Sequence, residues 1–144
     1  MTVSSFAEGT FVWTNFPFGP PDRPNVPGAV RHIAYVLASR SNGSLVQLLL
    51  AYTSSGSWRG AAPRAPIGII EFDEAAARAL SQRPFYIDLR CLARVSVTVE
   101  WFPDLALPDR GVVAVAATRV RDRILRAAEL LASRNPRLIE VRGI

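Results

Sequence analysis

Short runs of apolar and β-branched residues, separated by turn-forming residues, dominate the first two thirds of the chain. Runs of this kind, bounded by Gly, Pro, Asn or Ser, are typical of β-strands. The Asn42-Gly43 pair between two such runs is a strong signal for a β-hairpin. The pattern predicts strands at residues 10–16, 29–39, 45–53, 67–72, 84–88, 92–100 and 111–117.

Two predicted loops and two predicted helices separate or follow these strands. Residues 17–28 contain five prolines and two glycines, and residues 54–66 are mostly small or polar, so both segments read as loops. Residues 73–82 begin with two acids and continue with Ala and Leu, which favours a short helix. Residues 119–134 place apolar side chains at helical spacing and end before Pro136.

These elements predict one domain over residues 1–144 that is mainly β, or α+β in the loose sense. We expect a small, strongly bent antiparallel sheet or an SH3-like barrel, with a short inserted helix and a C-terminal helix. Asp88 and Arg90 flank Leu89 in a predicted strand, so they share a strand face and are expected to pair.

Length and composition support a folded protein outside the membrane. A chain of 144 residues with 49% apolar content can bury a sizeable core. No apolar run approaches the ~18 residues of a membrane span, and the N-terminus lacks the pattern of a signal peptide. We therefore expect a soluble, cytoplasmic protein. The single Cys and single His exclude an intramolecular disulfide and a Cys/His zinc site, and we expect no metal and no cofactor.

The net charge of +5 is carried entirely by arginine, since all 17 basic residues are Arg. The guanidinium group presents a planar fork that suits phosphate and stacks on bases. A basic balance of this kind favours an anionic partner, either nucleic acid or an acidic protein segment.

Three sequence pieces, in this order, resemble the PemK/MazF family of toxins. The first is GTFVW at residues 9–13, followed by Phe16 and Pro17. The second is PGAVRHIAYVL at residues 27–37, and the third is the apolar run 46–50 followed by the Tyr-Thr-Ser triplet 52–54. The family has an Arg-Pro pair where this chain has Arg31-His32.

This resemblance implies a barrel-like sheet with a terminal helix, usually assembled as a homodimer. It implies a toxin of a type II toxin-antitoxin system, a metal-independent endoribonuclease that cleaves single-stranded RNA. The products would be a 2′,3′-cyclic phosphate and a 5′-hydroxyl. It also implies a partner, an acidic antitoxin protein whose disordered tail blocks the RNA groove.

The resemblance also assigns two catalytic residues, Arg31 and Thr53, which lie at matching family positions on neighbouring strands of one hairpin. Neighbouring strands can bring such side chains to one spot. Arg31 would bind phosphate and transfer a proton, and Thr53 would donate a hydrogen bond to the scissile phosphate. A mechanism with two histidines is excluded because the chain has one.

Further residues are expected to contact the RNA around this pair: Phe16, Phe18, Arg23, His32, Ser54, Trp58 and Arg59. Alternation along the strand would point His32 away from Arg31, and a bulge would be needed to make it a general base. The Trp58-Arg59 pair lies in a predicted loop and suits stacking on an unpaired base. The equally weighted alternative is a Trp58 that folds back onto the sheet.

A second interpretation is a non-catalytic interaction protein on the same barrel. It would be a gyrase-targeting toxin of the CcdB type or a nucleic-acid-binding regulator. Cleavage of RNA in the presence of EDTA separates the two interpretations.

Overall fold

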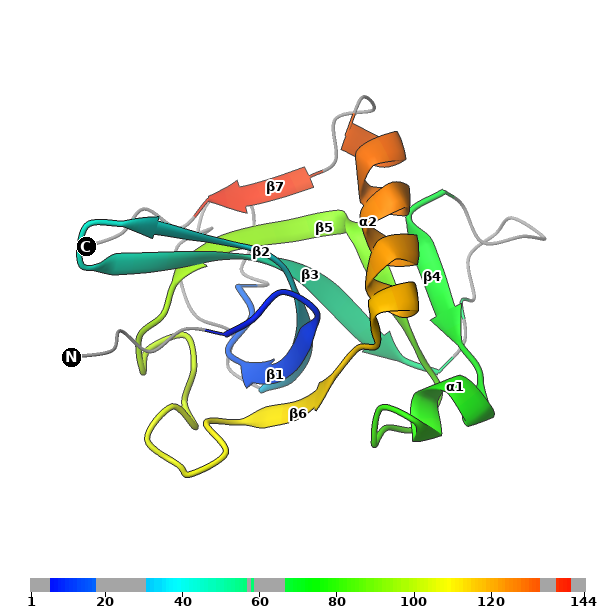
Figure 1. The fold of residues 1–144 in the computed structure, drawn as a ribbon, viewed down its shortest axis with the longest axis horizontal. Helices are drawn as coiled ribbons and strands as arrows, with labels where there is room; N and C mark the ends of the chain where they lie inside the picture. The colour runs from blue at the N-terminus through cyan, green and yellow to red at the C-terminus, as the bar shows by residue number, and fades with distance from the viewer. Residues whose placement is uncertain (1–5, 18–30, 57, 59–66, 133–136, 141–144) are drawn as a thin grey trace.

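The computed structural model describes residues 6–17, 31–56, 58, 67–132 and 137–140, without the side chains of Asn42 and of residues 137–140. All of its strands belong to one sheet, with the order β4-β5-β3-β2-β1-β6 and with β7 paired to β5 (Figure 1). The neighbouring pairs along this order are antiparallel, and the pair β5–β7 is parallel. The elements are β1 (Thr10–Thr14), β2 (His32–Asn42), β3 (Leu45–Ser55), β4 (Ile69–Phe72), α1 (Glu74–Arg78), β5 (Phe85–Ser96), β6 (Val112–Val115), α2 (Thr118–Ala132) and β7 (Arg137–Glu140).

The predicted fold class is confirmed at the level of a mainly β chain with a short inserted helix and a C-terminal helix. The order of the described strands ends at β4 on one side and at β6 on the other. These two strands are not paired with each other in the described part of the chain, so closure into an SH3-like barrel is not confirmed. No described helix is long and apolar enough to cross a membrane.

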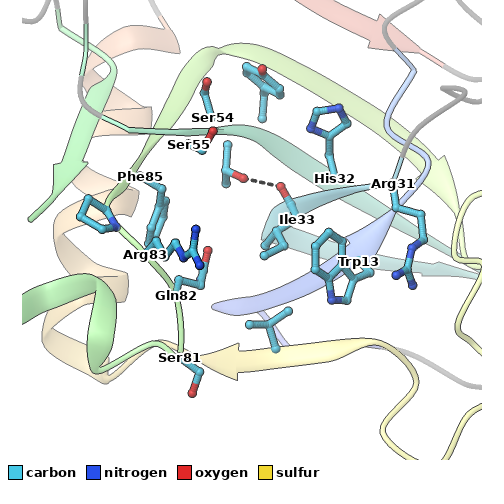
Figure 2. A pocket seen from close by; sticks show the side chains of 14 residues that line it. Trp13, Arg31, His32, Ile33, Ser54, Ser55, Ser81, Gln82, Arg83 and Phe85 are labelled. Atoms are coloured by element: carbon cyan, nitrogen blue, oxygen red, sulfur yellow. Dashed lines mark hydrogen bonds between the residues drawn. The ribbon is translucent and has the colours of Figure 1, made fainter. Parts of the chain in front are cut away.

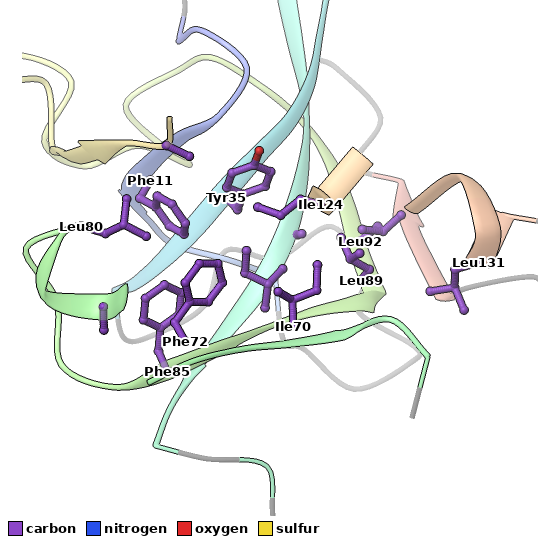
Figure 3. Packing of buried hydrophobic residues seen from close by; sticks show 14 residues of the cluster. Phe11, Tyr35, Ile70, Phe72, Leu80, Phe85, Leu89, Leu92, Ile124 and Leu131 are labelled. Atoms are coloured by element: carbon purple, nitrogen blue, oxygen red, sulfur yellow. The ribbon is translucent and has the colours of Figure 1, made fainter. Parts of the chain in front are cut away.

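The strands alternate between two hydrophobic clusters, one on each face of the sheet. Val12, Val36 and Leu50 lie in the first cluster, together with Trp101 and Phe102 from the segment that precedes β6. The second cluster contains the alternate positions of the same strands, and the two helices cover it (Figure 3). Its aromatic centre consists of Phe11, Tyr35, Phe72 and Phe85, where the last two rings stack with centroids 4.6 Å apart.

Both predicted helices form and close the second cluster, but α1 covers only Glu74–Arg78 and not the predicted residues 73–82. The carboxylate of Asp73 caps α1 by accepting a hydrogen bond from the amide of Ala76 at 2.9 Å. Helix α2 turns Ile124 and Leu131 into the cluster and leaves Arg119 and Arg123 exposed to solvent. The helix starts one residue earlier than its periodicity predicts, and the predicted residues 133 and 134 lie outside the described part of the chain.

The main departure from the predicted elements is in β5. Two short strands were expected at residues 84–88 and 92–100, but β5 is one strand that contains an irregularity. Tyr52 pairs with Asp88 while the adjacent Ala51 pairs with Leu92, so residues 89–91 have no counterpart on β3. The expected pairing inside this stretch is confirmed, because Arg90 donates to both carboxylate oxygens of Asp88 at 2.9 Å. Strand β7 was not predicted.

The sheet opens between β2 and β3, and this opening positions the candidate site. The two strands pair from the hairpin turn as far as Ala34 and Tyr52. Beyond that point β2 continues to His32 in partnership with β1, whereas β3 continues to Ser55 in partnership with β5. The two strands therefore diverge, and a cleft lies between their ends.

Candidate functional site

The cleft between the diverging strands has a volume of about 680 Å³, and Figure 2 shows the side chains around it. One wall comes from β1, the start of β2 and β6, and the other comes from the end of β3, the start of β5 and the segment before β5. The lining residues are Trp13, Arg31, His32, Ile33, Tyr52, Thr53, Ser54, Ser55, Ser81, Gln82, Arg83, Pro84, Phe85 and Val113. Four of the residues predicted for the site, Arg31, His32, Thr53 and Ser54, therefore meet at one cavity.

Arg31 lies at the mouth of the cleft, immediately before β2 begins. Its guanidinium forms an ion pair with the Asp104 carboxylate and lies over the ring of Trp13, 4.9 Å from the ring centroid. The side chain is still 48% exposed. Only one of its N–H groups is bonded within the described residues, so the others remain available to an anion.

Thr53 is buried, and its hydroxyl donates a hydrogen bond to the carbonyl oxygen of Ile33. This bond ties β3 to β2 at the first position where their backbone pairing stops. The hydroxyl hydrogen is therefore already used, and donation from Thr53 to a phosphate would require breaking the bond to Ile33. In this arrangement the side chain supports the cleft and offers a ligand an acceptor oxygen.

His32 lines the same cleft as Arg31, although alternation along a strand would separate them. The expected alternation is nevertheless confirmed, because the His32 ring points to the side of Tyr52 and the first hydrophobic cluster, whereas Arg31 reaches Trp13 on the other side of the strand (Figure 2). The imidazole ring lies 6.1 Å from the ring of Tyr52, centroid to centroid. An imidazole and a phenol thus line the cleft from one side of β2 and a guanidinium lines it from the other, and these are groups that can exchange protons with a ligand or stabilise its charge.

One part of the opposite wall was not predicted from the sequence. It is the turn from Ser81 to Pro84, between α1 and β5, and the backbone of Ser81 has a left-handed φ of 56°. The amide of Gln82 donates to the carbonyl of Ala77 at 3.0 Å. The amide of Gly56, just beyond β3, donates to the carbonyl of Pro84 at 2.8 Å. These bonds fix the turn against the end of β3.

This wall brings a second arginine to the cleft. Arg83 is exposed, and the described residues offer it neither an ion pair nor a hydrogen bond. The side-chain nitrogen Nε2 of Gln82 is buried and has no hydrogen-bond partner within the described chain. Such a donor costs free energy until water or a ligand accepts from it. The only sequence signal for this wall was the polar Ser-Gln-Arg-Pro stretch after the predicted helix.

The charge of the cleft is positive. Two arginines line it, and no Asp or Glu is among the described residues that do. Apolar and aromatic surface from Trp13, Ile33, Tyr52, Phe85 and Val113 forms much of the remaining lining. A concave surface with aromatic rings and arginines suits an anionic ligand that carries flat rings, as single-stranded nucleic acid does.

The other predicted contacts lie elsewhere or are not described. Phe16 is fully buried in the first hydrophobic cluster and is not among the residues that line the cleft; its ring lies 5.8 Å from that of Tyr52, centroid to centroid. Phe18, Arg23 and Arg59 lie outside the described residues.

Trp58 folds back onto the sheet. Its ring lies edge-on to Tyr86 at 5.8 Å and under the guanidinium of Arg90 at 5.0 Å, and its backbone amide donates to Glu71 at 2.9 Å. Trp58 is not one of the residues that line the cleft. Arg90 is committed to Asp88, and hydrogen bonding to that carboxylate raises the pKa of Arg90 above its usual value.

Within the described residues, no three His, Cys, Asp or Glu side chains are close enough together to hold a metal ion. A comparison of the chain with family models, with curated proteins and with solved structures finds no match.

Proposed function

We propose that the cleft binds single-stranded RNA and that the protein is a metal-independent endoribonuclease of the toxin class. The observation that carries the proposal is the lining of the cleft, where Arg31 and Arg83 flank aromatic surface and no Asp or Glu is among the described lining residues. Aromatic rings stack on unpaired bases, and arginine binds the phosphates between them. A volume of about 680 Å³ leaves room for such a segment.

Cleavage of RNA by its own 2′-hydroxyl needs a base, a stabiliser of negative charge and an acid. In the proposed reaction His32 takes the proton of the 2′-hydroxyl, and the 2′-oxygen forms a bond to phosphorus. The bond from phosphorus to the 5′-oxygen breaks, and the phenol of Tyr52 supplies the proton that this oxygen needs. Arg31 and Arg83 stabilise the additional charge on the phosphate oxygens.

This assignment modifies the roles that the family resemblance implies. Arginine holds its proton too firmly for a base near neutral pH, so Arg31 serves as a charge stabiliser and the proton transfer moves to His32. Thr53 serves by holding β2 and β3 in place through Ile33. All steps are assigned to side chains, which is why the proposed reaction is metal-independent.

The remaining parts of the proposal follow from the resemblance. The bent sheet is interpreted as an open form of the SH3-like barrel of PemK/MazF toxins. The protein would act in the cytoplasm as a homodimer, and an acidic antitoxin would inhibit it. A positive cleft without carboxylates is a suitable receptor for an acidic segment as well as for RNA.

The proposal is tested by incubating purified protein with single-stranded RNA in EDTA and analysing the ends of the products. We expect fragments that carry a 2′,3′-cyclic phosphate and a 5′-hydroxyl. RNA with 2′-O-methyl groups throughout should bind and stay intact, because it lacks the nucleophile. Binding of ordinary RNA without any cleavage would refute the enzymatic part of the proposal.

A second candidate function is a regulator that binds nucleic acid without cleaving it. The specific observation in its favour is that the hydroxyl of Thr53 is bonded to Ile33 and the charge of Arg31 is balanced by Asp104. Both residues are then less available for chemistry than for binding. Tight binding of RNA that stays intact in the assay above would favour this function. A CcdB-like toxin would neither bind nor cleave RNA and would inhibit DNA gyrase.

A further inference from the structure

The side chain of Arg31 is held in place by contacts that come from distant parts of the chain. Arg31 precedes β2, so no strand pairing fixes its backbone. Its guanidinium is instead placed between the ring of Trp13 on β1 and the carboxylate of Asp104. A flexible arginine that is held on two sides loses less conformational entropy when it binds an anion.

Gly111 allows these two supports to approach each other. Its backbone has a left-handed φ of 79°, a conformation that favours glycine. A Cβ atom at this position would lie 3.0 Å from the Cβ atom of Asp104 and 3.6 Å from that of Trp13. The carbonyl of Gly111 also accepts a hydrogen bond from the amide of Trp13 at 2.9 Å. The three residues therefore form one packed unit beside Arg31.

The segment that carries Asp104 is anchored to the core and to β1. Phe102, two residues earlier, is fully buried in the first hydrophobic cluster. The carbonyl of Trp101 accepts from the hydroxyl of Thr14 at 2.6 Å and from the amide of Asn15 at 2.8 Å. The carbonyl of Asp104 itself accepts from the amide of Leu107 at 2.9 Å. Asp104 is therefore presented from a fixed turn, and its side chain is only 16% exposed.

We infer that Asp104 is a positioning residue for RNA cleavage, which holds the guanidinium of Arg31 against Trp13 at the mouth of the cleft. This inference rests on the proposed function of the cleft. Asp104 does not line the cleft, so it acts through Arg31. It leaves the unbonded N–H groups of the guanidinium to the phosphate oxygens.

The ion pair has opposite consequences for binding and for the chemical step. The negative charge of Asp104 offsets the positive charge of Arg31 and so weakens the attraction of the cleft for RNA. The fixed guanidinium supports the transition state, where a displacement of about 1 Å can cost up to 100-fold in rate. Removal of Asp104 should therefore reduce kcat without weakening the binding of RNA.

The test compares Asp104→Ala and Asp104→Asn with the unmodified protein. Cleavage of single-stranded RNA gives kcat, and binding of a 2′-O-methyl oligonucleotide gives the dissociation constant. We expect Asp104→Ala to lower kcat by about 10- to 100-fold and to bind the oligonucleotide as tightly as before or more tightly. Asp104→Asn keeps an oxygen that accepts from Arg31, so it should retain more of the rate than Asp104→Ala. Glu74→Ala, which breaks an exposed ion pair with Arg78 far from Arg31, is the matched control.

A second measurement distinguishes loss of the contact between Arg31 and Asp104 from loss of folding. The exchange of the Arg31 Nη–H protons, one of which is bonded to Asp104, should be slowed in the unmodified protein and in Asp104→Asn and faster in Asp104→Ala when followed by NMR. If the unmodified protein cleaves RNA and Asp104→Ala cleaves it at the same rate, the role of Asp104 is overturned and the proposed function is not. Loss of binding and kcat together in a folded Asp104→Ala variant would also overturn it. An unmodified protein that neither binds nor cleaves RNA would overturn the proposed function and the inference with it.

Discussion

Replacement of Arg31 by alanine should separate a catalytic role from a structural one. The variant removes a half-exposed ion pair with Asp104 and a contact with the face of Trp13. An exposed ion pair contributes about 0–1 kcal/mol, and an exposed cation–π contact contributes about 0.5–1 kcal/mol. We therefore expect the free energy of unfolding to fall by about 1 kcal/mol, which lowers Tm by about 4 °C in a chain of this size.

The effect on activity should be much larger than the effect on stability. Loss of a group that stabilises developing charge in a transition state costs about 10²–10³ in rate. Thermal unfolding and a cleavage assay on a fluorogenic RNA oligonucleotide measure the two quantities on the same protein preparation. Arg31→Lys keeps the charge and loses the planar fork, so it should fall between the alanine variant and the unmodified protein.

Two results would refute this reasoning. A folded Arg31→Ala variant that cleaves RNA at the original rate would show that the family assignment does not hold for this residue. A variant that no longer folds would show that Arg31 is structural. Arg83→Ala, on the opposite wall, is the companion variant and should lower the rate with little change in stability, because Arg83 has no described partner.

Three further predictions concern the fold around the cleft. Thr53→Val removes the bond to Ile33 and should lower the free energy of unfolding by about 1–3 kcal/mol; an unchanged denaturation midpoint would contradict this. Burial raises the pKa of Tyr35 to about 12. The contribution of the neutral Tyr35 side chain to the free energy of unfolding should therefore be fully present below pH 10 and be lost as the pH rises through 12. This decrease in the free energy of unfolding amounts to about 3 kcal/mol. Denaturation curves recorded from pH 9 to 12 should show it in the unmodified protein and not in Tyr35→Phe. Gly9→Ala should cost about 1–3 kcal/mol, because φ is 90° there and a Cβ atom would lie 2.5 Å from Cδ of Arg121; a rise in Tm would contradict this.

Local sequence signals account for much of the fold. Asn42-Gly43 predicts the hairpin of β2 and β3, and the two acids Asp73 and Glu74 predict the start of α1. The apolar spacing that includes Ile124 and Leu131 predicts α2 and its buried face. Each of these signals lies within one element or one turn, so neighbouring residues are enough to reveal it.

The features that were missed depend on long-range contacts. The irregularity at residues 89–91 depends on how β5 aligns with β3, and nothing in that short stretch indicates the alignment. Strand β7 forms by parallel pairing with β5, which is distant in the sequence, so residues 137–140 alone do not indicate it.

The candidate site shows the same limit. Arg31, His32, Thr53 and Ser54 were predicted to act together, and the structure brings all four to one cleft. The second wall with Arg83 and the partner of Arg31 were not predicted. Asp104 lies 73 positions from Arg31, and no local sequence feature distinguishes it from the other acids of the chain.

The central claim is that the cleft binds single-stranded RNA through Arg31 and Arg83. The most direct test is the salt dependence of binding of a 2′-O-methyl RNA oligonucleotide. Each phosphate neutralised on a single strand contributes about −0.7 to the slope of log K against log salt, so Arg31→Ala with Arg83→Ala should make the slope shallower by about 1.4. Arg40→Ala with Arg126→Ala removes the same charge away from the cleft and should leave the slope unchanged. Equal slopes for the unmodified protein and the Arg31 and Arg83 double variant would contradict the account.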